Sequence, residues 1–156
     1  MKKAIIVTGT PGTGKTTFAK KLCRKFKLEY LDANNIIKQK KLKERYDSKR
    51  KTYVVDEKKL ALELVKEIKK SNKVFVIDSH LSQFIPVRYV KVCFVTKTDI
   101  KILNKRLKKR RYDKEKIKEN IQSEIFDICL NEALENKYKI IIIDTSKRTD
   151  FSKIRI

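Results

Sequence analysis

The sequence predicts an α/β fold in which a five-stranded parallel sheet carries helices on both faces. Five short, mainly apolar runs have the pattern of strands that are buried on both sides. The segments between them place apolar residues three and four positions apart, as amphipathic helices do. The 156 residues, 40% of them apolar, suit one domain spanning 1–156 with a single core. The predicted strands are 4–7, 28–31, 73–77, 90–95 and 140–143.

The first three predicted helices alternate with the early strands. One follows the first strand, and a second covers 32–43 and leads into a basic loop that contains Tyr46 and Tyr53. Asp56 is the predicted N-cap of the third helix, because its carboxylate can accept from free backbone N–H groups. The apolar stripes are Phe18, Ala19, Leu22, Cys23 and Phe26 in the first helix, and Leu60, Ala61, Leu64, Val65 and Ile68 in the third.

Two more helices are predicted between the fourth and fifth strands. Either Thr98 or Asp99 caps the first of them, and the second is predicted as one long amphipathic helix. After the fifth strand the chain runs only to Ile156, so we expect the closing helix to be short or missing. The apolar stripes are Ile100, Leu103 and Leu107 in one helix, and Ile117, Ile121, Ile125, Ile128 and Cys129 in the other.

Composition excludes several classes of protein. No apolar run approaches the ~18 residues that a membrane-spanning helix needs, and the opening apolar stretch is too short for a signal peptide. The three cysteines lie far apart, without the paired spacing of a zinc site or a redox dithiol. We therefore expect a cytoplasmic, reduced protein without a metal cluster, and by default a monomer.

The charge of the chain is strongly positive. Its 41 basic and 19 acidic residues give +22, which implies anionic partners such as nucleotide, RNA or an acidic surface. Residues 38–51 hold eight basic and two acidic residues (+6), and residues 97–119 hold eleven and four (+7). A lysine-rich compositional bias is the alternative explanation, although bias alone spreads charge more evenly. Both explanations stay open at this point.

The glycines indicate a phosphate-binding loop. All three lie in residues 9–17, GTPGTGKTT, a full match to G-x-x-x-x-G-K-[ST] between an apolar strand and an amphipathic helix. Inward-pointing backbone N–H groups of such a loop bind phosphate oxygens together with the helix N-terminus. This pattern predicts a P-loop NTPase. The predicted ATP ligands in the loop are Gly12, Thr13, Gly14, Lys15 on the β- and γ-phosphates, Thr16 on Mg²⁺, and Thr17 toward the α-phosphate.

Residues that follow the strands are the next candidates, because ligands of parallel sheets lie beyond the carboxyl ends of the strands. Asp78 follows the third strand, where a carboxylate can hold Mg²⁺ directly or through water. His80, the single histidine, lies two residues further on and can orient water or substrate. The alternatives are an aspartate that caps a turn and a histidine that is merely exposed.

Three arginines are candidates for contacts with phosphate. Arg88 offers a planar fork in the loop before the fourth strand. Arg106 and Arg110 lie four residues apart, hence on one helix face, next to a cationic stretch that ends at a turn. Arginines on such an arm can cover the charge that develops during phosphoryl transfer. A solvated basic face is the alternative.

Taken together, these motifs resemble the nucleoside monophosphate kinases, and most of all the small, ribosome-linked adenylate kinases of the isoenzyme-six type and their archaeal relatives. The resemblance covers roughly residues 4–133. It rests on TGTPGTGKTT at 8–17, LEY at 28–30, DSH at 78–80, FIPVR at 84–88, Arg106, Leu107, Arg110, Tyr112 and ENIQSEIF at 119–126.

The resemblance implies an AMP-binding arm near 32–55 and a short lid near 109–119. In that family the residues that match the phosphate loop and Arg110 hold ATP, and those that match Asp78 and His80 serve the Walker B role. Asn35 and Lys38 stand where relatives carry an aspartate and an arginine for AMP, and Arg111 replaces a lid glycine. The remaining implied contacts are Arg88 with AMP and the loop of Thr145 and Lys147 with adenine.

The resemblance also implies an activity and partners. The expected reaction is Mg²⁺-dependent transfer of the γ-phosphate from ATP to AMP, giving two ADP, with ATP hydrolysis beside it. The catalytic set would be Lys15, Asp78, His80, Arg106 and Arg110. The family is tied to maturation of the small ribosomal subunit, through a platform ribosomal protein and ribosomal RNA. One alternative is a ribosome-assembly ATPase whose kinase activity is secondary. Another is a kinase for a different metabolite, although the Gly-Gly-Gly turn of shikimate kinases is absent.

Overall fold

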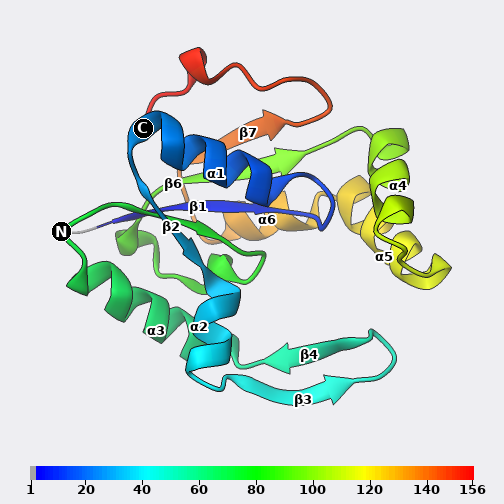
Figure 1. Cartoon of the computed structure of the whole chain (residues 1–156), viewed down its shortest axis with the longest axis horizontal. Helices are drawn as coiled ribbons and strands as arrows, with labels where there is room; N and C mark the ends of the chain where they lie inside the picture. The colour runs from blue at the N-terminus through cyan, green and yellow to red at the C-terminus, as the bar shows by residue number, and fades with distance from the viewer. Residues whose placement is uncertain (1–2) are drawn as a thin grey trace.

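A five-stranded, fully parallel sheet forms the centre of the protein, as predicted (Figure 1). The computed structural model describes residues 3–156. Strand order is β2-β5-β1-β6-β7, so the strand that carries the phosphate loop lies in the middle. The strands are β1 (Ala4–Gly9), β2 (Glu29–Asp32), β5 (Phe75–Asp78), β6 (Val90–Lys97) and β7 (Ile140–Asp144).

Helices cover both faces of this sheet, and the alternation of side chains along β1 shows how. Ile5 and Val7 point to the face covered by α1 (Lys15–Phe26), where they pack with Phe18 and Leu22. Ala4 and Ile6 point to the opposite face, which a larger group of helices covers. This second layer consists of α2 (Ala33–Gln39), α3 (Glu57–Lys70) and α6 (Ile128–Glu135).

Aspartate caps fix two helix starts where the sequence predicted them. Asp56 accepts from the backbone N of Lys59 at 3.0 Å and begins α3. Asp99, rather than Thr98, caps α4 (Ile100–Lys109), accepting from the backbone N of Lys101 at 2.9 Å. Each carboxylate satisfies N–H groups that the helix itself leaves without partners.

The predicted helix over 32–43 and the basic loop after it were partly wrong. The helix ends at Gln39, and a two-stranded antiparallel hairpin follows, made of β3 (Lys43–Asp47) and β4 (Thr52–Val55). Tyr46 lies directly opposite Tyr53, with ring centroids 5.1 Å apart. Cross-strand aromatic pairs and β-branched residues stabilise such a ribbon, and the high density of charge masked that signal.

The single long helix predicted after α4 was also wrong. It divides into α5 (Lys114–Ile125) and α6, with Asp127 between them in a left-handed conformation, φ 53°. The ammonium of Lys97 reaches across from β6 and donates to the backbone O of Glu124 at 3.2 Å and to the Asp127 carboxylate. This long-range contact stabilises the turn, which the local sequence pattern therefore could not predict.

The chain after β7 forms a short strap against α1. Its one 3-10 turn, Phe151–Lys153, stands where a closing helix was expected to be short or missing. Phe151 stacks on Phe18 with centroids 5.4 Å apart. Within residues 3–156, no helix is long and apolar enough to span a membrane, and no cluster of three or more histidine, cysteine or acidic side chains is suited to hold a metal ion.

Candidate active site

The phosphate loop connects β1 to α1 at the carboxyl edge of the sheet (Figure 1). Gly12 and Gly14 have φ of +94° and +81°, a region that residues with a side chain rarely adopt. A Cβ on Gly12 would lie only 2.8 Å from Leu103 and 3.0 Å from Leu107 of α4. Glycine is therefore needed at this position for the backbone conformation and for close packing of α4 on the loop.

Lys15, at the start of α1, folds back over the loop. Its Nζ donates to the carbonyl oxygens of Gly9 at 2.8 Å and Thr10 at 3.4 Å. Burial lowers the pKa of the Lys15 ammonium, and the nearby carboxylate of Asp78 opposes that shift. The side chain is a partly buried cation held by weak neutral acceptors, which an anionic phosphate group can replace.

Asp78 lies at the end of β5, next to the loop, and is buried. Its Oδ2 accepts from Thr16 Oγ1 at 2.5 Å and from the Tyr30 hydroxyl at 3.0 Å. The predicted pair of Thr16 and Asp78 is thus brought together. Mg²⁺ is bound in proteins by one or two such oxygen ligands with phosphates and waters completing the shell, so these residues fit that ion.

Tyr30 is a site residue that the sequence analysis did not single out. Pairing of β2 with β5 places Asp32 level with Asp78 and brings Tyr30 to this edge. Burial and the Asp78 carboxylate raise the pKa of the Tyr30 phenol, so it remains a hydrogen-bond donor. The only sequence signal was its place in the short 28–30 motif.

His80 lies beside Lys15, as its position after β5 predicted. The imidazole keeps access to solvent, yet the protein around it and the Lys15 ammonium lower its pKa. It is therefore neutral near pH 7 and can accept a proton or a hydrogen bond. A small recess of about 250 Å³ collects these groups. Its lining is Lys15, Thr16, Lys20, Tyr30, Asp32, Asn34, Asp78, Ser79, His80 and Leu81.

A larger cavity of about 560 Å³ opens on the other side of the loop. Its volume falls within the range of small-molecule sites. Arg110 enters it from the C-terminal end of α4, and Phe18 and Phe151 supply an apolar wall. Six predicted ATP ligands therefore share one cavity: Gly12, Gly14, Thr17, Arg110, Thr145 and Lys147.

Arg106 bonds to the protein itself. Its Nη2 donates to the backbone O of Thr145 at 2.9 Å, and Nη1 donates to the backbone O of Gly12 at 3.3 Å. Thr145 Oγ1 in turn donates to the backbone O of Thr13 at 2.7 Å. These bonds join α4, the phosphate loop and the loop after β7 into one unit, so Arg106 positions these elements.

The structure corrects the prediction for Arg88. This residue directly precedes Tyr89 and the first residue of β6, Val90, which pairs with Ala4 at the amino end of β1. The loop over 79–89 runs from the carboxyl end of β5 back to the start of β6. Because Val90 pairs with Ala4, Arg88 lies at the edge of the sheet opposite the phosphate loop. There its guanidinium lies 5.1 Å from the centre of the Tyr89 ring.

The other two AMP candidates lie on α2. Asn35 and Lys38 are exposed there, and neither lines the recess around Lys15. The neighbouring Asn34 does line it. The N-cap Asp32 accepts from the backbone N of Asn34 at 2.9 Å, which fixes the first turn of the helix at this edge.

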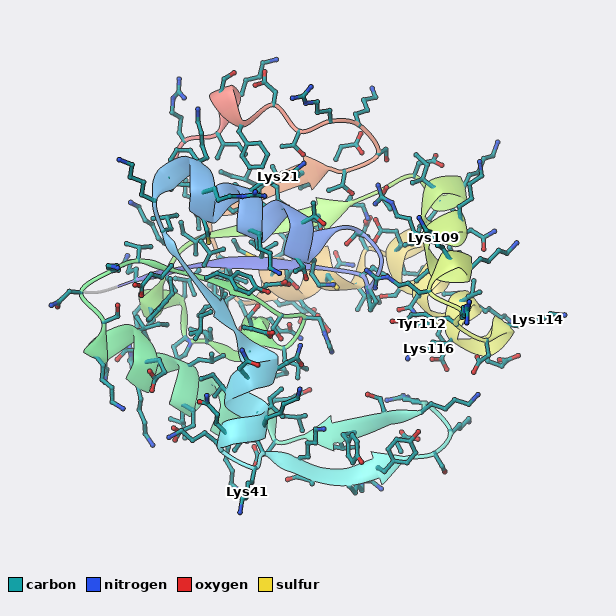
Figure 2. All side chains as sticks on the ribbon, in the orientation of Figure 1. Lys21, Lys41, Lys109, Tyr112, Lys114 and Lys116 are labelled. Atoms are coloured by element: carbon teal, nitrogen blue, oxygen red, sulfur yellow. The ribbon has the colours of Figure 1, made fainter. Side chains whose placement is uncertain are left out.

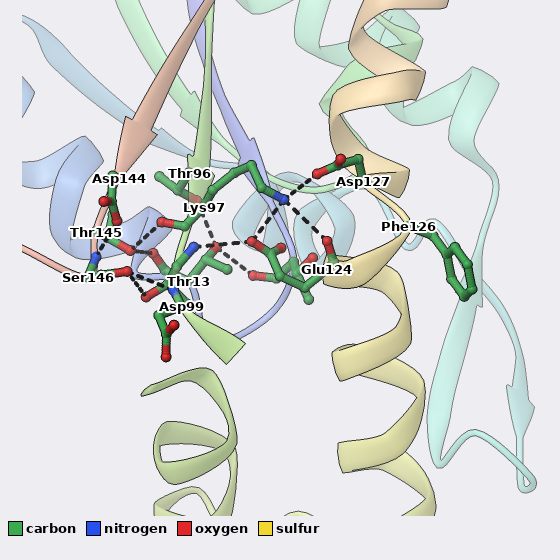
Figure 3. Close-up of polar contacts among 12 residues, drawn as sticks. Thr13, Thr96, Lys97, Asp99, Glu124, Phe126, Asp127, Asp144, Thr145 and Ser146 are labelled. Carbon is green, nitrogen blue, oxygen red and sulfur yellow. Dashed lines mark hydrogen bonds and ion pairs between the residues drawn. The ribbon is translucent and has the colours of Figure 1, made fainter. Parts of the chain in front are cut away.

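Glu124 is a second residue that the sequence analysis gave no role. It is only 5% exposed, and its Oε1 accepts from the backbone N of Thr98 at 3.1 Å and lies 3.1 Å from Lys97 Nζ. Figure 3 shows this network continuing from the backbone O of Lys97 to Thr145, and from Thr98 and Asp99 to Ser146. The signal was available, because Glu124 falls at helical spacing between Ile121 and Ile128 on an otherwise apolar stripe.

The hairpin and the turn between α4 and α5 face each other across a recess. Lys51 Nζ lies 2.6 Å from Asp113 Oδ2, and a recess of about 330 Å³ separates the two segments around this pair. Both groups are exposed, so the contact is a surface ion pair.

A phosphate loop with its lysine, a strand-end aspartate beside it and an arginine-bearing helix packed on the loop define a P-loop nucleotide kinase. Solved structures agree at the level of the fold. A sugar kinase from Janibacter sp. HTCC2649 has a TM-score of 0.62 at 17% identity, covering 95% of this chain and 88% of its own. A shikimate kinase from Bacteroides thetaiotaomicron has a TM-score of 0.57 at 16% identity, covering 94% and 88%.

Sequence relatives define the family within this class. A family model described as an AAA domain matches residues 5–127. The adenylate kinase isoenzyme 6 homolog of Dictyostelium discoideum is 38% identical over 142 residues, 91% of this chain and 79% of that protein. Those of Schizosaccharomyces pombe and Drosophila melanogaster are 37% and 34% identical, covering 90% and 96% of this chain and 79% and 84% of theirs. The chain belongs to the adenylate kinase isoenzyme 6 family.

Proposed function

We propose that this protein transfers the γ-phosphate of ATP to AMP, giving two ADP, with Mg²⁺ as cofactor. The observation that carries the proposal is the position of Lys15 and the phosphate loop between two openings. The large cavity suits the adenosine of ATP, and the small recess lies where an acceptor phosphate would face the γ-phosphate. A phosphate oxygen of AMP attacks, so the protein needs no nucleophile of its own.

On the ATP side, the amides of residues 12–17 bind the phosphates at the N-terminus of α1. Thr145 and Lys147 line the same cavity and are the proposed adenine contacts, and Arg110 would close over the phosphates from the end of α4. Lys15 leaves its two carbonyl partners for the β- and γ-phosphates. Once they are held on the bound phosphates, these cations stabilise the charge that develops during transfer.

Thr16 and Asp78 would hold Mg²⁺, since their oxygens already lie 2.5 Å apart at the end of β5. When bound, the ion neutralises charge on the β- and γ-phosphates. Tyr30 donates to the same Asp78 oxygen and orients the carboxylate.

On the AMP side, residues 32–55 form the acceptor arm and residues 109–119 the lid. Asn35 and Lys38 are the proposed AMP contacts on α2, with Asn34 at the recess. Arg88 is left out, because it lies at the opposite edge of the sheet. Closing the two arms would exclude water from the reacting phosphates.

A coupled assay of AMP-dependent ADP formation tests the proposal. We expect Lys15→Met to lower kcat/KM by about 10²–10³-fold, because it removes a cation from the transferring group. Lys25→Met, at the exposed far end of α1, is the matched control and should keep the wild-type rate. An unchanged rate in Lys15→Met would refute the proposal. A panel of AMP, CMP, UMP and GMP identifies the acceptor.

A second candidate function is ATP hydrolysis during maturation of the small ribosomal subunit, through contact with a platform ribosomal protein and ribosomal RNA. It is favoured by the neutral imidazole of His80 beside Lys15, which can orient water. ATP turnover without AMP, stimulated by small-subunit components and lost in His80→Ala, would support it. Turnover that survives in His80→Ala removes that role from the side chain.

A further inference from the structure

The β3–β4 hairpin combines exposed aromatic rings with a high density of positive charge. Tyr46 and Tyr53 are 54% and 50% exposed, although they are among the largest side chains of the segment. They lie opposite each other on one face of the ribbon, with their rings edge to face at 5.1 Å. The hairpin is a separate two-stranded sheet, so these rings lie outside both core clusters.

Cations surround these rings. Lys43 Nζ lies 4.2 Å from the centre of the Tyr53 ring. The turn between the strands presents Lys49, Arg50 and Lys51 in succession, all exposed. Residues 41–53 hold six basic and two acidic residues, a net +4 within thirteen positions.

The lid carries the same combination of a tyrosine ring and nearby lysines on the other side of the recess. Lys116 Nζ lies 4.3 Å from the centre of the Tyr112 ring. Figure 2 shows Lys109, Tyr112, Lys114 and Lys116 gathered on the α4–α5 end of the molecule. The recess of about 330 Å³ between hairpin and lid is lined by residues 49–51 and by the start of α5.

We infer that the hairpin, with the facing lid turn, binds single-stranded nucleic acid. Its rings would stack on unpaired bases while its lysines and arginines contact the phosphates. The inference deepens the ribosomal-RNA contact of the proposed function and rests on it. We define the hairpin surface as Lys43, Tyr46, Lys49, Arg50 and Tyr53.

The combination of groups selects this ligand over two others. An acidic protein surface would be held by the cations alone and would make no use of the exposed ring surface of Tyr46 and Tyr53. A duplex hides its base faces, so it too cannot use Tyr46 and Tyr53 for stacking. Unpaired bases joined by phosphates match both features at once.

The test is fluorescence anisotropy with labelled U12, dT12 and a duplex of the same length. Saturating ADP is present so that the nucleotide site is occupied. We expect the Tyr46→Leu/Tyr53→Leu double variant to bind both single strands at least about tenfold more weakly. The Tyr46→Phe/Tyr53→Phe variant keeps the ring faces and should stay within about twofold of wild type. The U12 and dT12 arms show whether the natural ligand is RNA or DNA.

Controls separate stacking from folding and from charge. Phe84→Leu removes an exposed ring outside the hairpin, 40% exposed, and should leave binding unchanged. Arg50→Ala, in the exposed turn, should lower the slope of log K against log salt by about 0.7, one phosphate contact. Thermal melting checks that each variant is folded.

The outcomes are distinct. Equal binding by the leucine and wild-type proteins overturns the inference and leaves the proposed function standing. So does a duplex or a poly-glutamate peptide that competes as well as U12 does. Absence of wild-type binding to any oligonucleotide overturns both this inference and the RNA contact of the proposed function, while AMP-dependent ADP formation is scored separately.

Discussion

At the scale of single residues, the site depends on charges that the fold places close together. Lys15 comes from the start of α1 and Asp78 from the end of β5, and both charges act on the pKa of His80. The ammonium and the surrounding protein lower the pKa of the imidazole, while the carboxylate opposes the change. His80 is the single histidine of the chain, so its titration can be followed without interference from another imidazole.

This pKa shift predicts a specific pH dependence of stability. The folded-state pKa of His80 lies below the ordinary value of 6.5, so as pH falls through that value the unfolded chain takes up a proton before the native one does. The free energy of unfolding therefore decreases as the pH is lowered through this window. When the pH is lowered from about 7.5 to about 5, we expect the Tm of His80→Gln to fall by less than the Tm of the wild type. Parallel Tm curves for the two proteins would contradict the shift.

At the scale of elements, α4 packs directly on the phosphate loop, and Gly12 makes this possible. A Cβ at position 12 would overlap Leu103 and Leu107, both fully buried. We expect Gly12→Ala to destabilise the protein by about 1–3 kcal/mol, measured by urea unfolding. Gly14→Ala is the matched control, since Gly14 has a similar φ of +81° but its Cβ would lie 3.9 Å from the nearest atoms. Equal losses would mean that backbone strain alone, and not the contact with α4, sets the cost.

The start of α6 and the end of α5 depend on a buried carboxylate. Glu124 is paired with Lys97, whose ammonium also contacts Asp127 and keeps some exposure to solvent. We expect Glu124→Gln to lower the free energy of unfolding by roughly 2–3 kcal/mol, because it leaves Lys97 with one carboxylate fewer. Glu119→Gln, exposed on the same helix, should change it by less than about 0.5 kcal/mol. A result for Glu124→Gln as small as that of the control would show that the pair does not hold the turn.

At the scale of the whole molecule, the hairpin and the turn between α4 and α5 are joined by the exposed ion pair of Lys51 with Asp113. Such pairs are weak and screened by salt, so this contact favours the closed arrangement without locking it.

The contact predicts a measurable change in the distance between the arms. In single-molecule FRET between labels at Ser48→Cys and Glu115→Cys, we expect Lys51→Glu to shift the ligand-free population toward longer distances, as high salt should in the wild type. The double variant Lys51→Glu/Asp113→Lys restores opposite charges and should recover the wild-type distribution. Identical distributions for Lys51→Glu and wild type would remove the pair as a determinant of closure.

Local patterns in the chain were sufficient to predict the sheet, the phosphate loop and the edge at which the site lies. Strands appear in the sequence as short apolar runs, and helices as apolar residues three and four positions apart. The phosphate loop appears as a cluster of glycines, because glycine readily adopts positive φ. The convergence of Lys15, Thr16, Asp78 and His80 followed, because parallel strands end at the same edge.

Which other groups reach that edge depends on long-range packing in the folded chain. The register of β2 on β5 brought Tyr30 to Asp78, and the span of the 79–89 loop carried Arg88 to the far side. Lys97, reaching from a strand, divided a predicted helix, and cross-strand pairing of Tyr46 with Tyr53 formed a hairpin from a segment that charge had marked as a loop. These outcomes depend on contacts between residues far apart in the chain, whose free energies outweigh local preference and leave no trace in a short window of sequence.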